Sequence, residues 1–103
     1  MQKIVKGKKY DTETASFIGN DSHSNPTDFH FWEESLYKTK KGSYFLHGEG
    51  GAATKYAMRA GQNSYCGGED IIPLSRDDAY EWAEKHLSTE EIEDEFSDFI
   101  EEA

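Results

Sequence analysis

From Ser75 to the end of the chain, apolar residues recur at helical spacing, and carboxylates fill most of the positions between them. Ser75 is a favourable N-cap for a first helix that runs to about Leu87, and Ser88 or Thr89 can start a second. Residues at i, i+4, i+7 and i+8 of the second helix form one apolar stripe, namely Ile92, Phe96, Phe99 and Ile100. We therefore expect two amphipathic helices with one buried face and one acidic face.

The excess of acidic charge is confined to the last third of the chain. Residues 69–103 hold 14 acids and 2 bases, a net charge of −12, whereas residues 1–68 carry +2 and the whole chain −10. Like charges at i and i+4 destabilise a helix by about 0.2–0.5 kcal/mol per pair. A cationic partner would relieve this repulsion, but a solvated face that keeps the protein soluble explains it equally well.

Composition also narrows the classes of partner and compartment. A net charge of −10 disfavours direct binding to nucleic acid and to anionic lipid surfaces. The single cysteine, Cys66, cannot form an internal disulfide, and residues 1–9 do not resemble a signal peptide. We expect a cytoplasmic protein with no membrane role.

The first third of the chain predicts a strand or hairpin followed by a short helix. Residues 3–5 are β-prone, and the Lys6-Gly7-Lys8 segment can turn. Asp11 is placed to cap a helix over residues 12–18, which Gly19 would end. Residues 20–27 have turn chemistry and predict a loop.

The middle third predicts an aromatic hairpin, a second short helix and a final strand. Residues 29–38 and 44–47 are expected to pair through the turn at Gly42. Alanine and tyrosine at helical spacing predict a helix over residues 52–60, followed by a loop over residues 62–68. Pro73 would confine a strand over residues 70–74 to an edge or a strand end.

Together these segments predict an α+β fold. We expect a three- to four-stranded antiparallel sheet packed by short helices and followed by the two acidic C-terminal amphipathic helices. At this length the chain is expected to form one domain over residues 1–103, with the acidic helical segment at 75–102.

No pattern of a catalytic or metal site is present, so we expect a protein that is not an enzyme and needs no cofactor. The four histidines do not have the spacing of a zinc site, and no calcium-binding loop pattern occurs. Cys66 has no visible activating base. The Gly48-Glu49-Gly50-Gly51 segment matches neither phosphate-binding pattern and is best interpreted as a tight turn.

Three segments carry a resemblance to a known family. They are Lys9-Tyr10-Asp11-Thr12-Glu13-Thr14-Ala15, Tyr44-Phe45-Leu46-His47-Gly48-Glu49-Gly50-Gly51-Ala52, and Gly67-Gly68-Glu69-Asp70-Ile71-Ile72-Pro73-Leu74-Ser75 with Ala79, Trp82 and Ala83. Together they resemble a family of small acidic proteins from mobile elements and phages of Gram-positive bacteria. Some members of that family are associated with anti-CRISPR activity against Cas9-type nucleases. The quoted residues are turn glycines and packing aromatics, so the resemblance implies a fold more than a mechanism.

The resemblance and the charge distribution lead to one functional expectation. An acidic helical face could occupy the positively charged nucleic-acid channel of Cas9, or of its guide-RNA complex, as a DNA mimic. The alternative is a non-catalytic regulatory or accessory module of a mobile genetic element that binds another protein through the aromatic hairpin and as a homodimer. The residues expected to contact the partner are Asp77, Asp78, Glu81, Glu84, Glu90, Glu91, Asp94, Glu95, Asp98 and Glu101.

Overall fold

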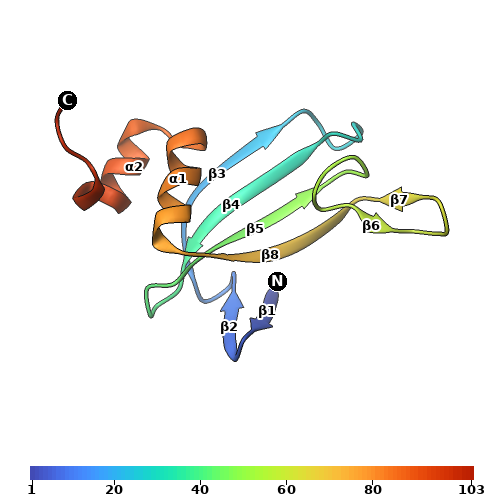
Figure 1. The fold of residues 1–103 in the computed structure, drawn as a ribbon, viewed down its shortest axis with the longest axis horizontal. Helices are drawn as coiled ribbons and strands as arrows, with labels where there is room; N and C mark the ends of the chain where they lie inside the picture. The colour runs from blue at the N-terminus through green and yellow to red at the C-terminus, as the bar shows by residue number, and fades with distance from the viewer.

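A four-stranded antiparallel sheet forms the centre of the computed structural model, which describes residues 1–103 (Figure 1). Its strand order is β3 (Ser16–His23), β4 (Trp32–Lys38), β5 (Tyr44–Gly50) and β8 (Gly68–Leu74). Two small hairpins complete the β structure, β1 (Gln2–Val5) with β2 (Lys8–Asp11) and β6 (Met58–Arg59) with β7 (Tyr65–Cys66). The helices are α1 (Arg76–His86) and α2 (Thr89–Phe96), followed by the 3-10 turn η1 (Ser97–Phe99). The α+β fold class is confirmed.

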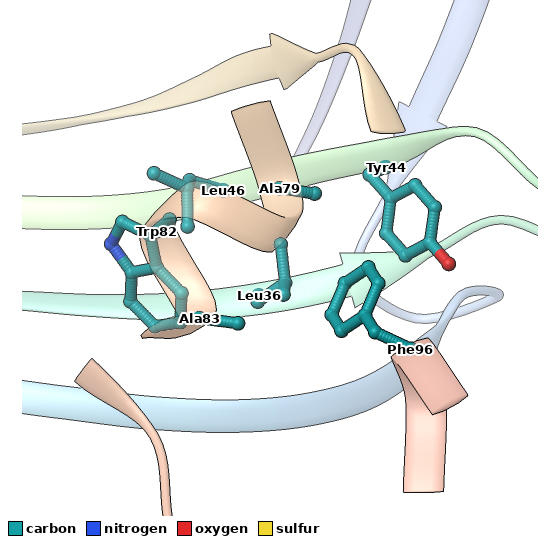
Figure 2. Close-up of a cluster of buried hydrophobic side chains, with 7 residues drawn as sticks. All are labelled: Leu36, Tyr44, Leu46, Ala79, Trp82, Ala83 and Phe96. Carbon is teal, nitrogen blue, oxygen red and sulfur yellow. The ribbon is translucent and has the colours of Figure 1, made fainter. Parts of the chain in front are cut away.

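The main core lies between the sheet and the two helices. Strand residues alternate between faces, so Leu36, Tyr44 and Leu46 point toward the helices (Figure 2). The Tyr44 and Phe96 rings stack with their centroids 5.5 Å apart. The cluster holds seven buried residues: Leu36, Tyr44, Leu46, Ala79, Trp82, Ala83 and Phe96. The helices therefore cover one end of one sheet face, and the β6–β7 hairpin extends at the opposite end of the molecule (Figure 1).

A smaller core lies on the other face of the sheet, under the β1–β2 hairpin. Phe45 and Ile71 are fully buried there, and Tyr10 meets the Phe45 ring edge-on at 5.6 Å. The Lys3 ammonium donates to the Asp70 carboxylate at 2.8 Å and so ties β1 to β8. Both faces of the sheet are thus covered in part.

Both C-terminal helices begin as the sequence predicts. The Ser75 hydroxyl accepts the Asp78 backbone N–H at 3.1 Å, which caps α1. Ser88 and Glu91 form a complete capping box at the start of α2. The predicted apolar stripe is shorter than expected, because α2 ends at Phe96 and Ile100 lies beyond η1 and is exposed.

The helix predicted over residues 12–18 is wrong. The Asp11 carboxylate accepts the Glu13 N–H at 2.9 Å, but this bond closes only a turn, and β3 starts at Ser16. From there the chain pairs with β4, from Ser16 opposite Lys38 to His23 opposite Trp32. Gly19 is no helix stop; a Cβ at this position would lie 2.5 Å from Leu87 Cδ2, so glycine lets the end of α1 approach the sheet.

The loop predicted over residues 20–27 is partly wrong, because β3 continues to His23. The polar side chains of β3 form hydrogen bonds to the neighbouring strand β4. The Asn20 amide, for example, donates to the Ser35 hydroxyl at 2.8 Å. At the end of α1, His86 Nδ1 lies 2.8 Å from the Asp21 carboxylate. Strand formation at an edge position tolerates such polar residues.

The helix predicted over residues 52–60 is also wrong. The segment forms turns that lead into β6, and the region predicted as a loop over residues 62–68 contains β7. A helix of nine residues flanked by glycine is marginal by itself. Here the Thr54 hydroxyl donates to the Gly51 carbonyl, and Tyr56 is drawn onto the sheet.

The remaining strand predictions are confirmed. The hairpin at the start of the chain turns through Lys6 and Gly7, which both have positive φ. The strand over residues 70–74 belongs to β8, which begins at Gly68 and is the edge strand that Pro73 requires. The aromatic hairpin is β4–β5, although β4 begins at Trp32 instead of residue 29.

Candidate functional site

The predicted contact residues lie on α1, on α2 and in the short segment after them. Most of these carboxylates are exposed, because Trp82, Ala83 and Phe96 turn the opposite faces of the helices toward the sheet. The exposed members are Asp77, Asp78, Glu81, Glu84, Glu90, Asp94, Asp98 and Glu101. The fold thus gathers eight of the ten predicted residues on solvent-facing positions of one C-terminal helical layer.

Three of the ten carboxylates already have strong partners within the chain. Glu91 completes the capping box of α2. Glu95 is half-buried and accepts hydrogen bonds from the Lys38 ammonium at 2.9 Å and the Tyr44 hydroxyl at 2.6 Å. These bonds tie α2 to β4 and β5, so Glu91 and Glu95 stabilise the fold and are poorly placed to contact a partner.

Asp98 is the third. It accepts a hydrogen bond from the Arg76 guanidinium at 2.5 Å, which joins η1 to the start of α1. This hydrogen bond holds the pKa of the Asp98 carboxyl below its usual range. The Arg76 guanidinium also lies 4.6 Å from the centre of the Phe99 ring. Asp98 therefore remains ionised, and the positive charge of Arg76 beside it offsets its negative charge.

The other carboxylates of the helical layer are weakly paired or unpaired. Glu84 accepts a hydrogen bond from the Tyr80 hydroxyl at 3.1 Å, and Glu81 lies 3.7 Å from the Lys85 ammonium. Among the predicted contact residues, those with neither an ion pair nor a side-chain hydrogen bond are Asp77, Asp78, Glu90, Asp94 and Glu101. Arg76 and Lys85 are the two bases of this part of the chain, and each is already paired with a carboxylate. The surface is therefore strongly anionic.

One buried carboxylate was missed by sequence reasoning. Glu34 on β4 is only 5% exposed, and its oxygens accept the Trp82 indole N–H at 2.9 Å and the Tyr56 hydroxyl at 2.5 Å. The Lys55 ammonium lies 2.7 Å from the same oxygen as Tyr56. Burial acts to raise the pKa of Glu34, but the hydrogen bonds from these three donors outweigh it, so the pKa lies below its ordinary value.

The Glu34 site joins three separate parts of the fold. Gly48 lies directly opposite Glu34 on β5, and a Cβ on Gly48 would lie 2.0 Å from the Tyr56 hydroxyl. Because Gly48 has no side chain, the Tyr56 ring can pack against the sheet at this position. Burial and the bond to Glu34 in turn raise the pKa of Tyr56, which stays protonated. The sequence signal was a glutamate at a helix-facing position of a strand, two residues before Leu36.

A pocket of about 430 Å³ lies beside Glu34. Its lining includes His23, His30, Trp32 and Lys55 together with Glu34 itself. The Glu34 carboxylate already interacts with three donors. These interactions attach residues 51–57 and α1 to the sheet, so Glu34 has a structural role. No group of three or more histidine, cysteine or acidic side chains is arranged to hold a metal ion.

Comparison of the chain with protein families, with curated proteins and with solved structures gave no match. Neither helix is both long enough and apolar enough to cross a membrane.

Proposed function

We propose that this protein is a non-catalytic inhibitor that binds a basic, nucleic-acid-handling protein through the outer face of α1 and α2. The observation that carries the proposal is the set of exposed carboxylates on these helices that have no cation beside them, such as Asp77, Glu90 and Asp94. Charged groups held on a folded scaffold lose less side-chain freedom on binding than those of a flexible tail. Such a surface complements a channel of Arg and Lys side chains.

Cas9 is the first candidate partner. The resemblance to small acidic phage and mobile-element proteins points to it, and Cas9-type nucleases hold nucleic acid in a positively charged channel. The acidic face would then compete with DNA for that channel, in the cytoplasm of a bacterial host.

The alternative of an accessory module that binds through the aromatic hairpin gains no support from its second strand, β5. Tyr44 and Phe45 of this strand are buried, with 2% and 0% of their surface exposed, so they are not available to a partner, whereas Phe29, before β4, is exposed. Lys38, at the end of β4, is engaged by Glu95. We therefore keep the acidic helical face as the proposed contact.

The test is DNA cleavage by guide-loaded Cas9 in the presence of the wild-type protein or of a triple charge reversal. The reversal is Glu81→Lys, Glu84→Lys and Asp94→Lys, which changes the net charge from −10 to −4. All three residues are exposed, and none lies in the first turn of its helix, so the fold should be retained. We expect inhibition by the wild-type protein and at least a tenfold weaker effect of the variant.

A control variant reaches the same net charge through positions outside the helices. Glu13→Lys, Glu33→Lys, Gln2→Lys and Gln62→Lys add the same six units of charge. This variant should inhibit like the wild type. Full inhibition by the helix variant, or equal loss in both variants, would contradict the proposed binding face; no inhibition of any Cas9 by the wild type would remove Cas9 as the partner.

A further inference from the structure

A groove of about 850 Å³ lies at the end of the sheet away from the helices. It lies between the turn before β4 and the β6–β7 hairpin. Three exposed apolar side chains line it: Phe29 is 71% exposed, Tyr65 60% and Met58 57%. Exposed apolar side chains gathered around one hollow mark a binding surface more often than single ones do.

Four of the residues that line the groove are glycines. Gly50 and Gly51 contribute from the end of β5, and Gly67 and Gly68 from the start of β8. A Cβ at any of these four positions would lie within 2.8 Å of another part of this chain, so the glycines let the segments that form the groove pack closely against one another.

The charge of the groove has one sign only. Asp28, Glu49 and Glu69 line it, and none of its 15 lining residues is Lys, Arg or His. Hydrogen bonds from the Ser24 hydroxyl and from the His30 backbone N–H hold the pKa of Asp28 below its usual range, so it is ionised. The nearest arginine, Arg59, donates to the Gly61 and Gln62 carbonyls of its own hairpin.

The register of the sheet places carboxylates directly opposite one another at this groove. Glu49 on β5 pairs with Glu69 on β8 and, on its other side, with Glu33 on β4. Like charges directly opposite one another are destabilising. The Asn20 amide donates a hydrogen bond to Glu33, and His47 Nε2 is hydrogen-bonded to Glu69. Glu49 lies between Glu33 and Glu69 and has no hydrogen-bond or ion-pair partner for its side chain within the chain. A cation in the groove would remove this repulsion.

We propose that the groove binds an arginine-containing apolar segment of a partner protein. The guanidinium would lie between the Glu49 carboxylate and the exposed aromatic rings of Tyr65 and Phe29, while a neighbouring apolar side chain of the segment covers Met58. Arginine fits better than lysine because its planar group both stacks on rings and pairs with carboxylates. The groove and the acidic helical face lie at opposite ends of the molecule, so this is a second surface that does not depend on the proposed function (Figure 1).

The test uses three blocked synthetic peptides and amide chemical shifts of the ¹⁵N-labelled protein. The probe is acetyl-Leu-Arg-Phe-Arg-amide; the controls are acetyl-Leu-Glu-Phe-Glu-amide and acetyl-Gly-Arg-Gly-Arg-amide. We expect saturable shifts for the probe at groove residues such as Gly51, Tyr65 and Gly67, and at least fivefold weaker binding of each control. Shifts confined to α1 and α2, equal binding of all three peptides, or no shifts would overturn the proposal.

Two pairs of variants separate the ring and the carboxylate. Tyr65→Ser and Glu49→Gln should each weaken probe binding at least fivefold. The controls are Phe17→Ser, which replaces an aromatic side chain that is 58% exposed, and Glu93→Gln, which replaces an exposed carboxylate. Both residues lie outside the groove, so both variants should bind the probe as the wild type does. All four positions are at least partly exposed, so each variant should stay folded, which its amide spectrum checks. Equal binding of the probe by the groove variants and the control variants would refute the assignment.

Discussion

Replacing Tyr56 by Phe should destabilise the protein strongly although it removes a single oxygen atom. That oxygen donates to the Glu34 carboxylate at 2.5 Å in a buried position. A hydrogen bond to a charged group contributes about 1.5–3 kcal/mol, and the Trp82 and Lys55 donors that remain prevent a larger loss. We expect a decrease of about 2 kcal/mol in the free energy of unfolding, or about 8–16 °C in Tm for a chain of this size.

The effect should also depend on pH in a defined direction. The pKa of Glu34 is lowered in the folded state, so its ionised form contributes stability above the unfolded pKa, and this stability is lost as pH falls through the folded pKa. Removing the Tyr56 donor raises the folded pKa of Glu34. The difference between wild type and variant should therefore be largest near neutral pH and shrink below about pH 4, near the unfolded pKa of glutamate.

The assay is urea unfolding followed by tryptophan fluorescence and circular dichroism between pH 3 and 7. Tyr65→Phe is the matched control, because Tyr65 is 60% exposed and makes no side-chain hydrogen bond. It should change the free energy of unfolding by less than about 0.5 kcal/mol. A Tyr56→Phe variant as stable as this control at pH 7 would refute the role assigned to the Glu34 network.

Three further predictions concern the packing of the fold, each measured by urea unfolding. Gly48→Ala should cost about 3 kcal/mol or more, because its Cβ would lie 2.0 Å from the Tyr56 hydroxyl; a loss below 1 kcal/mol would contradict that packing. Ser88→Ala should cost about 1 kcal/mol by removing the capping box of α2, and an unchanged urea midpoint would argue against it. Glu95→Gln should cost about 1–2 kcal/mol, because a half-buried carboxylate with donors from β4 and β5 is replaced by an amide; equal stability would show that these bonds contribute nothing.

The parts of the fold that the sequence predicts well are those set by local signals. Ser75 and Ser88 cap helices whose apolar residues recur over several turns, and the periodicity and the caps agree. Pro73 restricts its strand to an edge position, which the order of the sheet confirms. These signals depend on few long-range contacts.

The two wrong helices lie where long-range contacts decide the conformation. Asp11 has the chemistry of an N-cap, but residues 12–15 form only a turn and residues 16–23 pair with β4. Tyr56 has helical spacing with its neighbours, but its hydroxyl reaches Glu34, which lies 22 residues earlier in the chain. No local pattern contains that contact.

The candidate site shows the same division. The charge pattern placed most predicted contact residues on an exposed surface correctly, because a helix that buries its apolar stripe must expose the rest. It could not distinguish free carboxylates from those used within the fold, such as Glu95 and Asp98. Their partners, Lys38 and Arg76, are 57 and 22 residues away in the sequence.

The measurement that tests the central proposal most directly is the binding of the wild-type protein to guide-loaded Cas9 over a range of NaCl concentrations. If exposed carboxylates of α1 and α2 enter a channel of Arg and Lys side chains, the Kd should rise at least tenfold between about 0.05 and 0.5 M salt, as screening of exposed charges increases. No association at the lowest salt concentration, or a Kd that stays constant over the range, would contradict binding through the acidic helical face.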